Sequence, residues 1–97
     1  MEWKDITTYS RFDKKRIPRI LEYRLNKELT IIVHRHICDE STWFVTIHGT
    51  KINMVDLHTD DLATAKNLAI EIFIAFLNEK IEEYKFAVEK LKEKLSV

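Results

Sequence analysis

The sequence predicts an α+β domain in which a four-stranded antiparallel meander is followed by one long C-terminal helix, in the order ββββα. Apolar and polar residues alternate through residues 20–58, which is typical of strands. An apolar pattern with spacings of three and four then runs unbroken from Leu62 to Leu95, which is typical of a helix. Because 97 residues can form one core but not two, we expect a single domain: a flap and basic loop at residues 1–19, the sheet at residues 20–58 and the helix at residues 60–95.

The first two strands are predicted in "ILEYRL" and "LTIIVHRHI". If residues 26–28 form the loop between them, Leu21 lies opposite Val33 and Tyr23 lies opposite Ile31. Apolar side chains then meet on one face. A slip of one residue would move each of them to the other face, so this match supports the register.

The third strand is predicted in "TWFVTIHG", with Val45 and Ile47 on the apolar face. A loop at residues 38–42 keeps these two side chains on the face of the second strand's apolar residues and places His34 opposite Thr46.

A two-residue type II′ turn at Gly49-Thr50 would lead into the fourth strand. It would place Ile47 opposite Ile52 and Val45 opposite Met54.

The helix is predicted to begin after "HTDDLATAK", where Thr59 or Asp60 can cap the free amides. From Leu62 to Leu95 it would be roughly 50 Å long, whereas a strand of about seven residues spans only about 23 Å. The helix therefore extends well beyond the sheet.

Two apolar series run along this helix. The first is expected to face the sheet and comprises Leu62, Ala65, Ala69, Ile72 and Phe76. The second, called the seam here, alternates spacings of four and three as a coiled-coil interface does, and comprises Ile70, Ile74, Leu77, Ile81, Tyr84, Val88, Leu91 and Leu95. Only the seam continues into the second half, and a projecting helix of about 18 residues is marginal alone in water. We expect the seam to bind further copies of the chain; binding of another protein, or a tail that folds back or frays, are the alternatives.

Lysines flank the seam in the tail, and no acidic residue of the tail is expected to face them. A symmetric pair of helices, parallel or antiparallel, would bring lysine near lysine. This favours a larger bundle, packing onto another subunit's sheet, or an acidic foreign partner. The flanking residues are Lys80, Lys85, Lys92 and Lys94.

Composition restricts the other function classes. Sixteen basic and sixteen acidic residues cancel, so global charge favours neither nucleic acid nor an anionic membrane. The longest apolar run, from Leu68 to Leu77, is too short to span a bilayer, which takes roughly 20 residues. The single cysteine, Cys38, and the charged start "MEWKD" favour a cytoplasmic setting.

No motif for catalysis or cofactor binding is recognisable, so we expect a protein that is not an enzyme and needs no cofactor or metal. As a remote alternative, His34, His36 and His48 on one sheet face could hold a divalent metal. A nucleophilic role for Cys38 has no recognisable supporting group.

The segment "RFDKKRIPR" concentrates positive charge ahead of the first strand. With Phe12 beside it, it could bind phosphates while the aromatic ring stacks on a base, so nucleic acid is the alternative partner. A solvated loop is the simpler interpretation. The basic residues concerned, which are also the candidates for ligand binding, are Arg11, Lys14, Lys15, Arg16 and Arg19.

Aromatic and aliphatic residues recur at every third position of "WKDITTYSRF". We expect a short helix or an extended flap over the second face of the sheet, covering Ile32, Phe44, Val55 and Leu57. Alternatively, these rings line a groove for a small or peptide ligand.

The order "WKDITTYSRFDKKRIP", "IIVHRHI", "TWFVTI" and "DLATAKNLAI" resembles small uncharacterised proteins of bacteriophages and prophages of Gram-positive bacteria. The resemblance covers the chain up to about residue 70 and carries over no catalytic residue. It implies a phage accessory role in the host cytoplasm, where such proteins inhibit or redirect host factors, including defence systems. Together with the seam, it predicts a non-catalytic homo-oligomer that binds a host protein or a small ligand.

Overall fold

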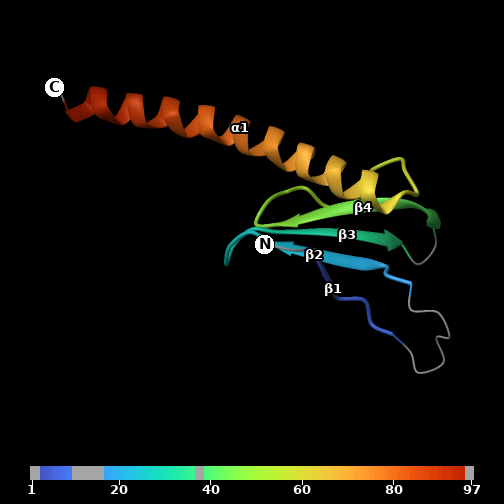
Figure 1. Ribbon diagram of the computed structural model, residues 1–97. Helices are drawn as coiled ribbons and strands as arrows, with labels where there is room; N and C mark the ends of the chain where they lie inside the picture. The colour runs from blue at the N-terminus through green and yellow to red at the C-terminus, as the bar shows by residue number, and fades with distance from the viewer. Residues whose placement is uncertain (1–2, 10–16, 37–38, 96–97) are drawn as a thin grey trace.

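The computed structural model describes residues 3–9, 17–36 and 39–95, the last two ranges forming most of one sheet and one helix. The strands are β1 (Lys4–Asp5), β2 (Ile20–Arg24), β3 (Thr30–His36), β4 (Asp39–His48) and β5 (Val55–Asp56), and the helix is α1 (Leu62–Leu95). All neighbouring strands are antiparallel and the sheet order follows the chain order, β1-β2-β3-β4-β5 (Figure 1). The predicted α+β arrangement is confirmed, with five strands in place of four.

The pairing of β2 with β3 is as predicted, with Leu21 opposite Val33 and Tyr23 opposite Ile31. Asn26 shapes the turn because its side-chain oxygen accepts hydrogen bonds from the amides of Glu28 and Leu29, at 2.8 and 2.9 Å. Because the turn is short and is held by a local side-chain acceptor, it fixes how the two strands align. In this register the apolar residues of β2 and β3 lie on the same face.

The pairing of β3 with β4 keeps the predicted faces but shifts the predicted partners. Val33 lies opposite Val45, and His34 lies opposite Phe44, not Thr46. The reason is an irregularity after Arg35, because the next pair joins His36 to Asp39. Residues predicted as part of the loop at 38–42 therefore belong to β4 from Asp39 onward.

The β4–β5 register differs by one residue from the prediction. Ile47 and Ile52 face each other as expected, through a 3.0 Å bond from the Ile47 amide to the Ile52 carbonyl. Val45, however, lies opposite Val55 and not Met54. Met54 takes a positive φ of 51°, and its amide donates to the Thr46 hydroxyl at 3.0 Å, so one residue is absorbed as a bulge.

This slip inverts Leu57. Strict alternation predicts Leu57 on the second face of the sheet, but its side chain is 6% exposed and belongs to the core. Its amide donates to the carbonyl of Trp43 at 2.9 Å, which fixes its alignment with a core residue of β4. A bulge adds one residue to a strand, so each side chain after it points to the opposite face from the one that strict alternation predicts.

The Gly49 turn also differs from the prediction. The amide of Thr50 donates to the carbonyl of Ile47 at 3.3 Å, which makes Gly49 the third residue of the turn and not the first of a two-residue loop. Its φ of 89° suits the third position of a type II turn, where glycine is favoured.

The N-terminal segment lengthens the sheet. Strand β1 pairs Lys4 with Glu22 and Asp5 with Leu21, so the expected flap or short helix over the second face is replaced, within residues 3–9, by an edge strand. The Trp3 ring contacts Tyr23 edge-on at 5.4 Å between centroids and lies under Lys66 of the helix at 5.7 Å, so it extends the helix-covered face.

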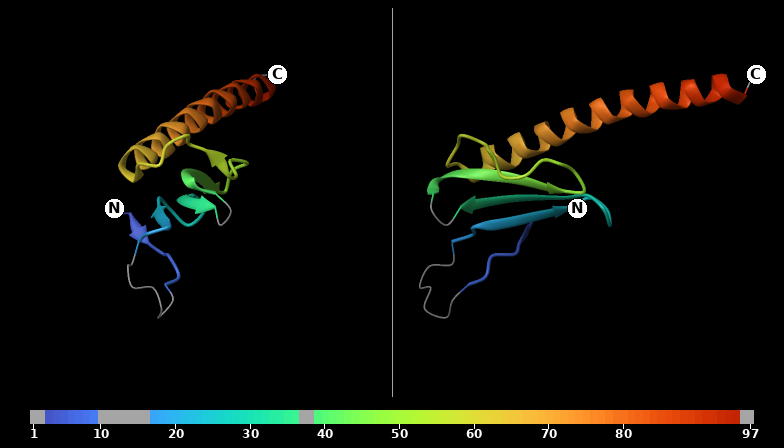
Figure 2. Two further views of the ribbon diagram at one scale, coloured as in Figure 1. Left: turned by 90° about the vertical axis from the view of Figure 1, so that its right-hand side faces the viewer. Right: turned by 180° about the vertical axis from the view of Figure 1, so that it is seen from behind.

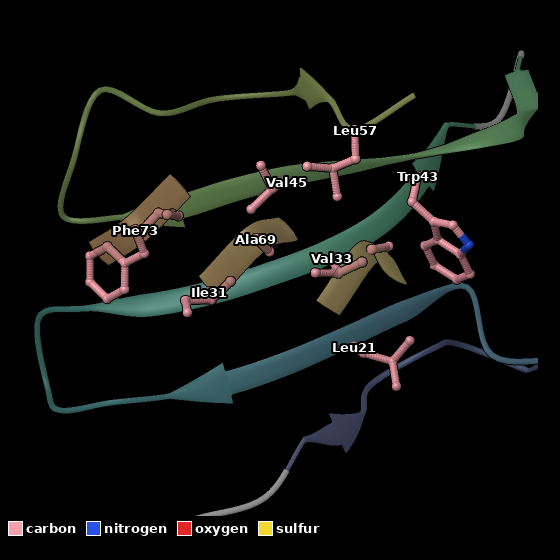
Figure 3. Close-up of a cluster of buried hydrophobic side chains, with 10 residues drawn as sticks. Leu21, Ile31, Val33, Trp43, Val45, Leu57, Ala69 and Phe73 are labelled. Carbon is pink, nitrogen blue, oxygen red and sulfur yellow. The ribbon is translucent and has the colours of Figure 1, made fainter. Parts of the chain in front are cut away.

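The core lies between the helix-covered face of the sheet and the first half of α1 (Figure 3). Val33, Val45 and Ile47 are fully buried, and from the helix the buried side chains are Ala65, Ala69 and Phe73. The two alanines let the helix approach β3 and β4 closely. The predicted core-facing series is confirmed in part: Ala65 and Ala69 are buried, and Leu62, Ile72 and Phe76 are partly buried against the core, but the series omitted Phe73, the most buried large side chain of the helix.

Asp61 caps the helix, not Thr59 or Asp60. Its side chain accepts from the amide and the hydroxyl of Thr64, at 3.0 and 2.5 Å, and these bonds lower the pKa of the carboxyl. The preceding carbonyl of Asp60 accepts from the Trp43 indole at 3.0 Å and from the Arg35 guanidinium at 3.1 Å. A buried core residue therefore fixes the point at which the helix begins.

The helix has the predicted bounds and extends far past the sheet, as Figure 2 shows from two sides. The molecule measures 69 × 25 × 22 Å with a radius of gyration of 17.8 Å. A compact chain of this length has a radius of gyration of about 12.5 Å. The difference comes from the projecting end of the rod, which no other described part of the chain covers.

Candidate interaction surface

The second half of α1, residues 81–95, is exposed at every position. Its apolar residues keep the spacing of the seam, and Leu91, for example, is 66% exposed. Ile70 and Leu77 of the seam are partly buried against the core, whereas the other seam residues are exposed: Ile74, Ile81, Tyr84, Val88, Leu91 and Leu95. An exposed apolar stripe of this length makes the seam a candidate interaction surface.

Phe86 is a further exposed aromatic residue outside the seam, at 62% exposure. Counting from Ile81 as position a, Phe86 falls at position f, outside the interface of a two-helix coiled coil. The ammonium of Lys90 lies 5.4 Å from its ring centroid. In the sequence, Phe86 is visible only as an isolated aromatic residue among charged ones, and a heptad pattern of a and d positions does not include it.

One of the lysines beside the seam has an acidic partner in the tail. Lys80 forms a 3.0 Å ion pair with Glu83, and this hydrogen bond raises the pKa of the lysine. Its ammonium also lies 5.6 Å from the Phe76 ring centroid. The expectation that no tail acid faces these lysines is therefore wrong for Lys80.

An apolar groove of about 210 Å³ lies beside the first half of the helix, between α1 and the end of β2. Its walls carry three seam residues, two core residues and two exposed or half-buried residues from the β2 side of the sheet. They are Ile70, Ile74 and Leu77 from the seam, Phe73 and Ile31 from the core, and Tyr23 and Leu25 from the β2 side. The seam thus faces the β2 side of the sheet, where the single helix leaves apolar surface uncovered.

A second, more polar hollow of about 420 Å³ lies where the helix leaves the sheet, between the Gly49 turn and Tyr84. Thr50, Lys51, Phe76 and Lys80 complete its lining. The turn is held tightly here, because a Cβ on Gly49 would lie 2.4 Å from the carbonyl oxygen of Glu28.

The histidines occupy separate positions. His34 stacks on Phe44, with centroids 6.1 Å apart, and its Nε2 lies 3.0 Å from the hydroxyl of Thr46. His48 lies opposite Thr30, four residues along β4 from the partner of His34, which is about 13 Å. The side chain of His36 lies outside the described part, and no group of three metal-binding residues occurs within that part.

Most of the basic segment lies outside the described residues, namely Arg11, Lys14, Lys15 and Arg16, and Cys38 does so as well. Arg19 is described: its guanidinium donates to the carbonyl of Thr8 at 3.4 Å and its amide donates to the hydroxyl of Thr7 at 2.8 Å. These bonds hold the start of β2 against the N-terminal segment. The nucleic-acid interpretation stays a prediction.

The chain matches no protein-family model, no curated protein and no solved structure. The described part of the chain contains no helical stretch with the length and hydropathy of a membrane span. The seam and the groove therefore have to be interpreted from their own chemistry.

Proposed function

We propose that this chain is a non-catalytic accessory protein that assembles with copies of itself through the seam and binds a host protein or a small ligand in the assembled state. One observation carries the proposal: residues 81–95 expose an apolar stripe along their whole length. A lone helix of this size is marginal in water, so the stripe needs a partner to be stable. The resemblance noted in the sequence suggests a phage-type setting, in which the target is a host factor such as a component of a defence system.

The polarity of the tail supports self-assembly through one side. Around the helix, the seam lies at one side while Glu82, Glu89 and Glu93 lie at the other, so the tail is amphipathic despite its full exposure. An interface formed on the seam would leave the acidic side in water. The sheets of the assembled chains would then be free to present their outer faces to a target.

The test compares the wild-type chain with Val88→Asp/Leu91→Asp, using Glu82→Ala/Glu89→Ala as the control on the opposite side of the helix. Light scattering on a size-exclusion column measures the mass, and circular dichroism verifies that the fold is kept. The proposal predicts an oligomer for the wild type and the control, and a folded monomer for the aspartate variant. A single-chain mass for all three forms contradicts it.

A further inference from the structure

We propose that the assembly is an antiparallel dimer in which the tail of each chain fills the apolar groove beside the other chain's helix. This inference rests on the proposed self-assembly and adds the orientation, the register and the residues that meet. A second copy of the chain is the occupant of the groove, and three observations support it.

The first observation is the pairing of the seam with itself. If Ile81 lies opposite the partner's Tyr84 in an antiparallel pair, every seam residue acquires a seam partner. The layers are Ile70 with the partner's Leu95, Ile74 with the partner's Leu91, Leu77 with the partner's Val88, and Ile81 with the partner's Tyr84, each repeated by symmetry. The two-fold axis passes between residues 82 and 83.

The second observation is the groove. Its helical wall consists of the core residue Phe73 and three seam residues, and this register sets all three seam residues against the end of the partner's tail: Ile70, Ile74 and Leu77. Its volume of about 210 Å³ is below the 300–1,000 Å³ of small-molecule sites, so side chains suit it better than a ligand does. A helix about 10 Å wide also covers only about two strands spaced 4.8 Å apart. A second helix is therefore needed over the β2 side, beside Tyr23 and Leu25.

The third observation is charge. In this register Lys92 lies beside the partner's Glu71, Lys85 lies beside the partner's Asn78, and Lys80 lies beside the partner's Ala87. The acid that faces Lys92 comes from the first half of the partner's helix, and neither Lys85 nor Lys80 lies beside a lysine. A parallel pair would set Lys80 beside the partner's Lys85. Antiparallel registers one heptad away would set Lys80, or Lys85, beside its own copy.

Cysteine cross-linking tests orientation and register in one protein. The variant Ile74→Cys/Leu91→Cys is made in a Cys38→Ser background, so that only the two new thiols can pair. Both positions are exposed in the single chain, and 17 residues of helix, about 25 Å, separate them, which prevents an internal disulfide. Trypsin cleaves at lysines between them, so mass spectrometry identifies which peptides are joined.

The proposal predicts covalent dimers in which position 74 is joined to position 91. Links of 74 to 74 and 91 to 91 show a parallel pair and overturn it. A wild-type dimer without any link in the variant overturns the register but leaves the proposed self-assembly standing, whereas a wild-type monomer overturns both. Ala75→Cys/Glu89→Cys, on the opposite side of the helix, is the matched control and should give no link.

A charge exchange supplies independent evidence. Glu71 and Lys92 lie about 31 Å apart along one helix, so they cannot attract each other within a chain. Glu71→Lys alone should weaken the dimer about ten-fold, because two attractive pairs become repulsive. Glu71→Lys/Lys92→Glu should restore the wild-type dissociation constant. Failure of the double variant to recover any affinity would overturn the register.

Discussion

Truncating Leu91 to alanine should separate the stability of the dimer from the stability of the fold. Leu91 is 66% exposed in the single chain and belongs to the second half of α1, which extends beyond the sheet (Figure 1). Alanine is at least as good a helix former as leucine, so Leu91→Ala should leave the unfolding of the isolated chain nearly unchanged.

Leu91→Ala should, by contrast, raise the dissociation constant of the dimer strongly. Leu91→Ala removes three carbon groups, whose full burial is worth about 2.4 kcal/mol at about 0.8 kcal/mol each. Two thirds of the Leu91 surface is exposed in the single chain, so the part that association can bury is worth about 1.6 kcal/mol per copy. With two copies in the interface the loss is about 3.2 kcal/mol, which raises the dissociation constant roughly 200-fold.

Phe73→Ala provides the contrast. Phe73 is 4% exposed and fills the core between helix and sheet, so its truncation should cost about 3–5 kcal/mol of folding stability whether or not the chain associates. Glu89→Ala, exposed on the side of the helix away from the seam, should change neither quantity.

Sedimentation equilibrium measures the dissociation constants, and urea unfolding at low and high protein concentration measures the folding stability. If Leu91→Ala lowers the stability of the dilute monomer by more than about 1 kcal/mol, the tail packs within its own chain and the reasoning is refuted. An unchanged dissociation constant refutes it equally.

Three other predictions concern the turn, the helix cap and the basic segment. Gly49→Ala should destabilise the fold by about 2 kcal/mol or more in thermal unfolding, because φ is positive there and the new Cβ would meet the Glu28 carbonyl; an unchanged midpoint would show that the turn relaxes at no cost. Hydrogen bonds from Thr64 lower the pKa of Asp61, so its contribution to stability is complete above the unfolded-state pKa and disappears as the pH falls through the lower folded-state pKa. Asp61→Asn should keep the cap but lose this acid dependence, and equal acid dependence of both proteins in pH-dependent unfolding would contradict the assignment. If the basic segment binds nucleic acid, replacing residues 14–16 by alanine should reduce the salt dependence of binding in a fluorescence anisotropy titration, whereas absence of binding by the wild type at low salt would exclude that function.

The elements that the sequence predicted best are those governed by local chemistry. The helix bounds at Leu62 and Leu95 are confirmed because no glycine or proline interrupts the pattern. The β2–β3 register is confirmed because the turn between the strands is short. In both cases neighbouring residues suffice to select the conformation.

The errors arise where a side chain or a distant contact replaces a regular backbone bond. The Thr46 hydroxyl accepts a hydrogen bond from the Met54 amide, and this bond permits the bulge that places Leu57 in the core. Phe73 and Ile72 both fit a helical spacing from Ala69, and only the position of the sheet selects Phe73. The seam was visible in the sequence, but the groove that faces it needed the placement of Tyr23 beside the helix.

The mass of the 97-residue chain in solution tests the central claim most directly. One chain has a mass of 11.6 kDa, so the dimer has twice that, 23.2 kDa. Light scattering over a range of protein concentrations should give 23.2 kDa at the higher concentrations. A mass of 11.6 kDa at every concentration, with the helix still folded by circular dichroism, would show that the seam binds no second copy.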